Sequence, residues 1–177
     1  DLLFGEEKTT PGVSDAGKRD FSIYTPEFLR AVGRMKEASI PLFMSGAYVG
    51  TDLTMSADTA MASQVKKILH FFPRTGHAVR TGGSAATDMA SPDFTVRLEF
   101  NTGKTDDIYA AESPDAIEPA DKQSFTALRY TETHTSAAVM HRGDVRSFVM
   151  GFPFETIILQ AERDALMKQI LDFLLNK

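Results

Sequence analysis

The chain has 177 residues, enough for one domain with a sizeable hydrophobic core. Its net charge of −5 leaves no basic surplus to neutralise phosphates, which argues against nucleic-acid binding. It contains no cysteine, so disulfides, thiolate metal sites and cysteine nucleophiles are excluded, and no stretch approaches the roughly 18 apolar residues that a membrane span requires.

The first half of the chain reads as alternating strands and helices. The opening DLLFG is typical of a buried strand that ends in a turn. Residues 25–38 have a strong helix start, with Thr25 as the cap and Pro26 in the first turn. The run IPLFMS that follows is apolar on both faces, which predicts a central parallel strand between two layers of helices. Asp58 is expected to cap the next helix, which Pro73 would end.

The second half reads mainly as short strands with turns between them. We expect one strand at residues 77–80, further strands within 94–132, a rigid surface loop over SPDAIEPAD (113–121) and a hairpin over 136–152. Residues 162–177 have the apolar spacing of an amphipathic helix, with Leu166, Ile170, Leu171 and Leu174 facing the sheet.

These elements predict one α/β domain over residues 1–177. The expected fold is a three-layer, flavodoxin-like or amidotransferase-like sheet, mostly parallel, with an antiparallel β extension. Because the sequence starts without Met and within a strand, we read it as the later part of a longer polypeptide. Further N-terminal strands and any targeting signal would then lie upstream of residue 1.

A small-residue bend follows the predicted central strand. Ser45 ends the strand, and GAYVG (46–50) places Tyr48 between two glycines with the spacing of a nucleophile elbow. Glycines leave room for a strained central residue, and the helix after such an elbow directs free N–H groups at whatever lies above it. A phenol is a poor nucleophile without a strong base nearby. Two interpretations remain: Tyr48, Ser45 and Gly46 line a pocket at the carboxyl end of the strands, or the small residues allow tight packing of strand against helix, with Tyr48 capping the sheet.

Two segments together, LFMSGAYVGTDL and VMGFPFETI, resemble the class I glutamine amidotransferase-like superfamily. The resemblance implies a catalytic cysteine at the elbow and a late strand leading into G-x-Q-F-H-P-E. Here Tyr48 stands at the cysteine position and Glu155 at or near the catalytic histidine. Glutaminase activity is therefore not expected.

A resemblance over nearly the whole chain adds SPDAIEPAD, LRY, HRGD and the terminal LMKQILDFLLNK. With these runs the chain is similar to exported Bacteroidetes proteins of the xanthan lyase-like group. The resemblance implies an exported protein, periplasmic, cell-surface or secreted, that acts in polysaccharide recognition or utilisation or as a scaffold for neighbouring domains of the same chain. A polysaccharide or oligosaccharide is the expected partner, and no cofactor or metal is expected.

The alternative is a catalytic lyase or hydrolase that uses Tyr48 with acids from the same pocket. Glycoside hydrolysis needs paired carboxylates, and Asp52 and Glu155 both follow strand ends beside the predicted pocket. A structural role is the more common one for each: Asp52 can cap a helix start, and Glu155 can accept backbone N–H bonds before the last helix. Arg129 ends a strand and could reach the pocket, where it would neutralise a uronate carboxylate.

The remaining histidines offer no spacing that assembles a site. His141 is expected at the tip of the 136–152 hairpin, exposed to solvent, together with Arg142. His70 lies near the apolar stripe of its predicted helix and is expected to be a partly buried core histidine.

Overall fold

Capping side chains set where the first two long helices begin. In the computed structural model of the chain, the Thr25 hydroxyl accepts a hydrogen bond from the Phe28 N–H and opens α1 (Pro26–Glu37). Asp58 accepts from two N–H groups in the first turn of α3 (Thr59–Leu69). Both predicted caps are confirmed. The structure describes residues 2–3, 22–55, 58–86, 95–103, 105–111 and 113–175.

The main sheet has seven strands in the order β1-β2-β9-β8-β7-β4-β5. The strands are β1 (Leu2–Leu3), β2 (Leu42–Ser45), β4 (Gly83–Ala86), β5 (Arg97–Glu99), β7 (Ser124–Tyr130), β8 (Ser136–His141) and β9 (Ser147–Met150). β2 is parallel to both β1 and β9, as the apolar run predicted. The other four pairings are antiparallel. The sheet is therefore mixed, and the expectation of a mostly parallel sheet is wrong; the predicted hairpin over 136–152 is confirmed as β8 and β9.

A second, two-stranded antiparallel sheet joins β3 (Phe71–Thr75) to β6 (Ala116–Pro119). It overturns three expectations. The helix does not continue to residue 72, because His70 adopts a left-handed conformation (φ 62°) that ends α3. The expected strand at 77–80 is replaced by β3, and the segment 113–121 is a largely buried strand region rather than a surface loop.

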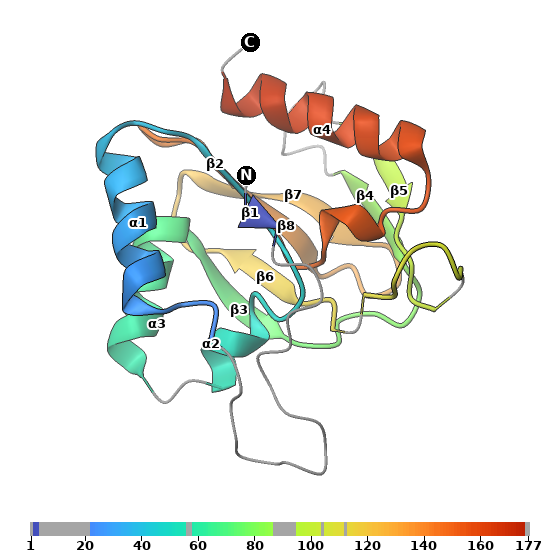
Figure 1. Cartoon of the computed structure of the whole chain (residues 1–177), viewed down its shortest axis with the longest axis horizontal. Coiled ribbons are helices and arrows are strands. Elements are labelled where there is room, and N and C mark those ends of the chain that lie inside the picture. The colour runs from blue at the N-terminus through green and yellow to red at the C-terminus, as the bar shows by residue number, and fades with distance from the viewer. Residues whose placement is uncertain are drawn as a thin grey trace.

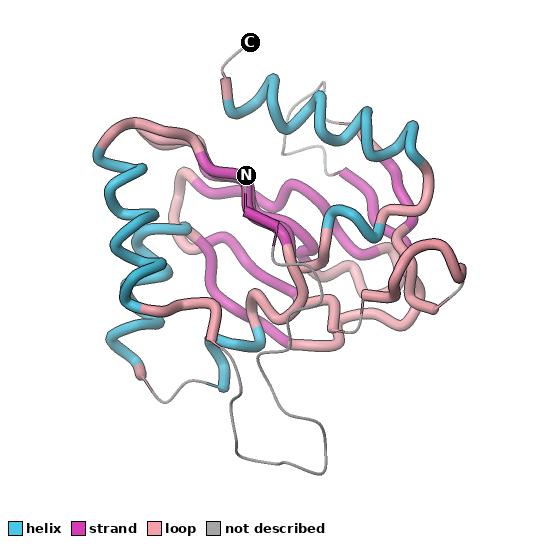
Figure 2. Tube along the Cα trace, viewed as in Figure 1, coloured by secondary structure: helices cyan, strands magenta, loops and turns pink. Residues whose placement is uncertain are grey.

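Successive side chains along the strands of the main sheet point to opposite faces and pack into two separate cores. Phe43, Phe148 and Met140 face α4 (Gln160–Leu174), whereas Met44 and Val149, one residue away, face the layer of α1 and α3. Figures 1 and 2 show α4 across one side of the sheet, with α1, α3 and the β3–β6 pair on the other. In the terminal helix Leu166, Ile170 and Leu174 are buried as predicted, but Leu171 is exposed.

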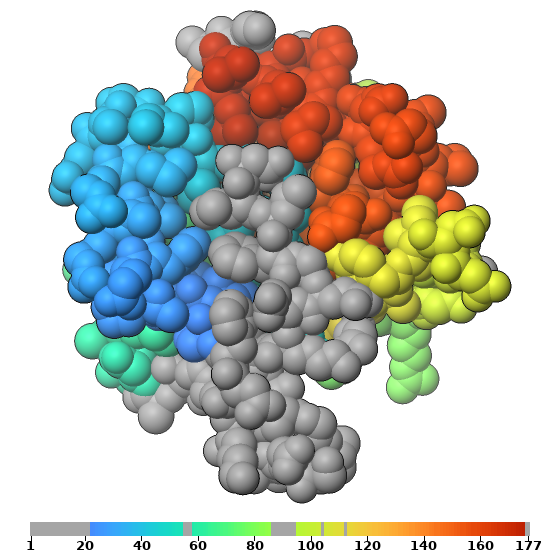
Figure 3. All heavy atoms as spheres, viewed as in Figure 1, coloured from blue at the N-terminus to red at the C-terminus, as the bar shows by residue number. Residues whose placement is uncertain are grey.

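Two short helices complete the described chain: α2 (Thr51–Met55) after β2, and the 3₁₀ helix η2 (Phe154–Thr156) after β9. The space-filling view shows α1 and α4 on separate flanks of the visible face (Figure 3). None of the described helices combines the length and the apolar content needed to cross a bilayer.

The turn after β9 allows no side chain at Gly151. A Cβ there would lie 2.1 Å from the carbonyl oxygen of Asp115, and the Gly151 backbone is held by bonds to Ala137 and Asp115. We expect Gly151→Ala to lower the free energy of unfolding by about 3 kcal/mol, since a backbone must move to relieve the clash. Urea denaturation measures the loss.

Gly33, in the middle of α1, is the matched control. No atom lies within 4 Å of a Cβ at that position, so Gly33→Ala should raise stability by about 0.5–1 kcal/mol through helix propensity. Equal effects of the two substitutions would contradict the packing described for the β9 turn.

Candidate functional site

The bend after β2 has the backbone strain that its glycine pattern predicted. Ser45 ends the strand, and residues 47–50 form a turn that leads into α2. Tyr48 has φ 61°, a left-handed conformation that a bulky residue rarely adopts. Its side chain is 7% exposed. Strain of this kind persists only where the surrounding structure imposes it, and it concentrates at functional positions.

The carboxyl ends of β2 and β9 bring the bend and the Glu155 turn together. The two strands are parallel neighbours, so the segments that follow them leave the same edge of the sheet. A hydrogen bond joins them directly, from the Phe154 N–H to the Ser45 hydroxyl at 3.2 Å. Glu155 is the next residue, in η2. Ser45 therefore connects the predicted elbow to the predicted acid.

Glu155 has one satisfied and one unsatisfied carboxylate oxygen. The Tyr109 hydroxyl donates to Oε1 at 2.6 Å. Oε2 is buried and has no hydrogen-bond partner in the part of the chain that the structure describes. A buried carboxylate oxygen without a donor costs free energy, so this atom marks a position where a donor from a ligand or a water would be stabilised. Tyr109 belongs to this group, although its sequence context did not assign it to the site.

Asp52 has a structural task instead. It is completely buried in α2, and its Oδ2 accepts from the Ile23 N–H at 3.0 Å and from the Ser22 hydroxyl at 3.2 Å. The carboxylate thus fastens the segment before α1 to the short helix after the elbow. Gly46, at the start of the bend, lies between Ser45 and this helix.

Asp115, which the sequence placed in a surface loop, is a buried acid beneath the elbow. It accepts hydrogen bonds from the Gly50 N–H (2.6 Å), the Thr51 N–H (2.8 Å) and the Thr51 hydroxyl (2.6 Å). Burial raises the pKa of Asp115 to about 6, even though these bonds to Thr51 and Gly50, and the nearby His77, pull it down. The sequence signal was present: Asp115 stands immediately before the apolar Ala-Ile pair of β6.

Arg129 does not reach this group. Its side chain is exposed on β7, and its guanidinium donates to the carbonyl of His134 within its own hairpin, at 3.0 Å. β8 separates β7 from β9 in the sheet, and β2 lies beyond β9. The structure therefore brings Ser45 together with the Glu155 turn and leaves Arg129 apart.

The acids at this edge do not form a glycosidase pair. Glycoside hydrolysis uses two carboxylates about 5–9.5 Å apart that face the substrate. Asp52 and Asp115 are buried, and each accepts hydrogen bonds from backbone N–H groups. Among the carboxylates considered at this edge, Glu155 alone retains an oxygen without a partner in the described chain. The geometry suits binding of a hydrogen-bond donor better than bond cleavage by paired acids.

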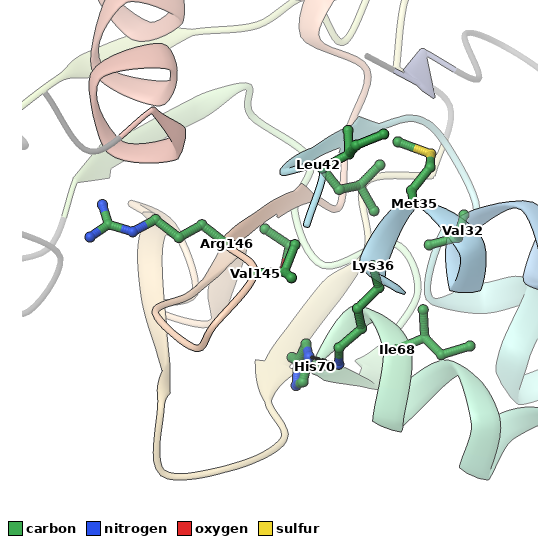
Figure 4. A pocket seen from close by; sticks show the side chains of 10 residues that line it. Val32, Met35, Lys36, Leu42, Ile68, His70, Val145 and Arg146 are labelled. Carbon is green, nitrogen blue, oxygen red and sulfur yellow. Dashed lines mark hydrogen bonds between the residues drawn. The ribbon is translucent and has the colours of Figure 1, made fainter. Parts of the chain in front are cut away.

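A second polar group lies at the opposite edge of the sheet. His141 ends β8, which runs antiparallel to β9, so it lies beside the amino ends of β9 and β2. Its ring stacks on His70, with the centroids 3.4 Å apart and the planes within 4°. Asp121 contacts both rings, and the Lys36 ammonium lies 2.9 Å from His70 Nε2, as Figure 4 shows for Lys36 and His70.

This arrangement corrects the expected location of His141 and alters the protonation of the group. His141 is 4% exposed, so the expectation of a solvated residue at the hairpin tip is wrong. Burial, and then the neighbouring His70, lower the pKa of His141 to about 4. Burial would raise the pKa of Asp121, but hydrogen bonds from His70 and Ser124 lower it to about 2. His70 is partly buried, as predicted, and burial also lowers its pKa.

Comparison with models of known protein families and with curated proteins finds no match to this chain.

The raised pKa of Asp115 makes stability depend on pH in a defined direction. Up to about pH 6 the folded protein keeps a proton on this carboxyl, whereas the unfolded chain loses it near pH 3.8. This contribution to stability therefore declines as the pH rises from about 4 to 6, by up to about 3 kcal/mol. Asp115→Asn should remove that decline, as measured by urea unfolding across this range.

The control is Asp107→Asn, which neutralises an exposed carboxylate. It should leave the pH profile unchanged. A constant difference in stability between wild type and Asp115→Asn from pH 4 to 7 would show that Asp115 does not take up a proton in this range.

Proposed function

We propose that this chain is a non-catalytic, amidotransferase-like module of an exported protein that binds a polysaccharide or oligosaccharide at the carboxyl edge of its sheet. The observation that carries the proposal is Oε2 of Glu155, a buried oxygen without a partner among the described residues, in the turn joined to the β2 bend. A ligand hydroxyl would reach it by displacing the groups that cover it. Neighbouring domains of the same polypeptide would supply any catalysis.

The arrangement of β2 and β9 supports the amidotransferase-like part of the proposal. A central parallel strand runs into a bend with a left-handed central residue, and an adjacent parallel strand runs into the turn that carries Glu155. These are the two places where the resemblance expects a nucleophile and its histidine. A phenol and a carboxylate stand there instead, and that pair lacks both the thiol and the base that thioester chemistry needs. The finer assignment to a flavodoxin-like or amidotransferase-like sheet is part of this proposal.

The chemistry of the acceptor favours a sugar as the ligand. An ionised carboxylate only accepts hydrogen bonds, and sugars present many hydroxyl donors. A second negative charge beside Glu155 would be repelled, and the net charge of −5 adds to that repulsion at long range. We therefore expect the contact at Glu155 to be made by neutral hydroxyl groups of the glycan, with any uronate carboxylate directed away from it.

The catalytic alternative keeps one supporting observation, the strained backbone at Tyr48. A lyase would use this phenol in proton transfer at C5 of a uronate. It would also need a cation to neutralise the uronate carboxylate, and Arg129, the predicted candidate, is bonded within a distant hairpin. Binding without cleavage is thus the better supported function.

The test measures glycan binding by calorimetry with neutral and uronate-containing oligosaccharides, including xanthan fragments. Glu155→Gln should weaken binding at least tenfold, because the amide replaces an acceptor while the bond to Tyr109 can persist. Asp107→Asn, an exposed change of the same charge, should bind as wild type does.

The same preparations decide between binding and cleavage. Release of an unsaturated uronate, followed by its ultraviolet absorbance and lost in Tyr48→Phe, would establish the lyase. Binding that is unaffected by Glu155→Gln would remove the carboxyl edge as the binding site.

A further inference from the structure

Three potential metal ligands converge from distant parts of the sequence at the amino edge of the sheet. His70 ends α3, Asp121 lies in the turn after β6, and His141 ends β8. One donor atom from each lies within 4.8 Å of the other two. Their separations in sequence match no metal-binding motif, so only the fold brings them together.

The hydrogen bonds of the group define where its protons are. An ammonium can only donate, so His70 Nε2 accepts from Lys36 and His70 Nδ1 carries the proton. That proton points at Asp121 Oδ2, 2.7 Å away. The Ser124 hydroxyl donates to Asp121 Oδ1, so it accepts from His141 Nδ1 at 3.0 Å. The His70 imidazole is therefore neutral, and both rings direct their Nδ1 side towards one carboxylate.

We propose that His70, Asp121 and His141 form a binding site for a divalent transition-metal ion, with Zn²⁺ as the best match. Two imidazoles and one carboxylate are a common ligand set for zinc, with water in the fourth position. In this structure the Nδ1 proton of His70 occupies the place between ring and carboxylate that the ion would take.

The distances are close to those the ion requires. Ligand atoms about 2.0–2.1 Å from a tetrahedral zinc are separated by about 3.3 Å. His141 Nδ1 is already 3.5 Å from Asp121 Oδ1, whereas His70 Nδ1 lies 2.7 Å from the other oxygen, Oδ2, so the carboxylate would hold the ion between its two oxygens. His70 Nδ1 must move roughly half an ångström away from the carboxylate, and its ring must turn out of the parallel stack, because an imidazole binds metal in the plane of its ring.

Two features permit that adjustment. His70 is the less buried of the two rings and lines a surface hollow with Ser63, Lys66, Lys67, Ala120 and Asp121, through which an ion and its water can enter. Each imidazole can bind the ion through Nδ1 while it carries its proton on Nε2. At His70 this tautomer requires the Lys36 ammonium to withdraw, so Lys36 competes with the metal.

Competition between Lys36 and the metal ion predicts opposite effects of substitutions at Lys36 and at the two histidines. Zn²⁺ binding to tag-free protein is measured by calorimetry, and Co²⁺ is used in parallel for its visible absorption. Wild type should bind one equivalent, and His70→Asn and His141→Asn should each weaken binding at least tenfold. Lys36→Met should tighten it about tenfold, because it removes a positive charge beside the site.

A matched substitution distinguishes metal binding at this site from metal binding at surface histidines. His134 has a left-handed backbone like that of His70 (φ 57° against 62°) and is exposed. His134→Asn should leave binding unchanged. Asparagine tolerates the left-handed conformation of His70 and can replace the Nδ1–H donor of either histidine, so the histidine variants should fold. If a histidine variant does not fold, the tighter Zn²⁺ binding expected of Lys36→Met is the test. Absence of binding by wild type at millimolar Zn²⁺, retention in His70→Asn, or weaker binding in Lys36→Met would each overturn the proposal.

Discussion

The buried carboxylate of Asp115 is the interaction on which the arrangement of the carboxyl edge depends. It binds the Gly50 and Thr51 N–H groups at the end of the β2 bend, while its own N–H donates to Gly151 in the turn after β9. Its carbonyl also accepts from the Tyr130 hydroxyl of β7. One residue just before β6 thus connects the bend, the β9 turn and a third strand, and it fixes the end of the bend that contains Tyr48.

Because Asp115 and Asp52 hold the scaffold together, they are unavailable for chemistry. Each buried acid accepts the N–H groups of a segment that must stay close to the elbow, and removing either partner would leave buried polar groups unpaired. Glu155 differs in retaining a free acceptor in the described chain. The same edge therefore contains two acids that stabilise the bend and one that retains an oxygen without a partner in the described chain.

The two polar groups of the molecule are separated by the length of the central strands. The Glu155 group lies where β2 and β9 end, and the paired histidines lie where these strands begin. A metal at the second group would join α3, the β6 turn and β8 without contacting a glycan at the first. Metal binding would then change the stability of the protein more than any binding at the Glu155 group.

The sequence by itself determined the elements whose causes are local. Thr25 and Asp58 cap the helices they precede, the apolar run 42–44 forms an inner parallel strand, and the glycine-flanked bend strains Tyr48. Tertiary structure decided the features that depend on partners far along the chain. The antiparallel half of the sheet, the burial of Asp115 and the stacking of His70 on His141 all arise from contacts between residues that no local period connects. Burial of a polar side chain depends on such distant donors, and for that reason the segment 113–121 and the hairpin histidine were expected at the surface.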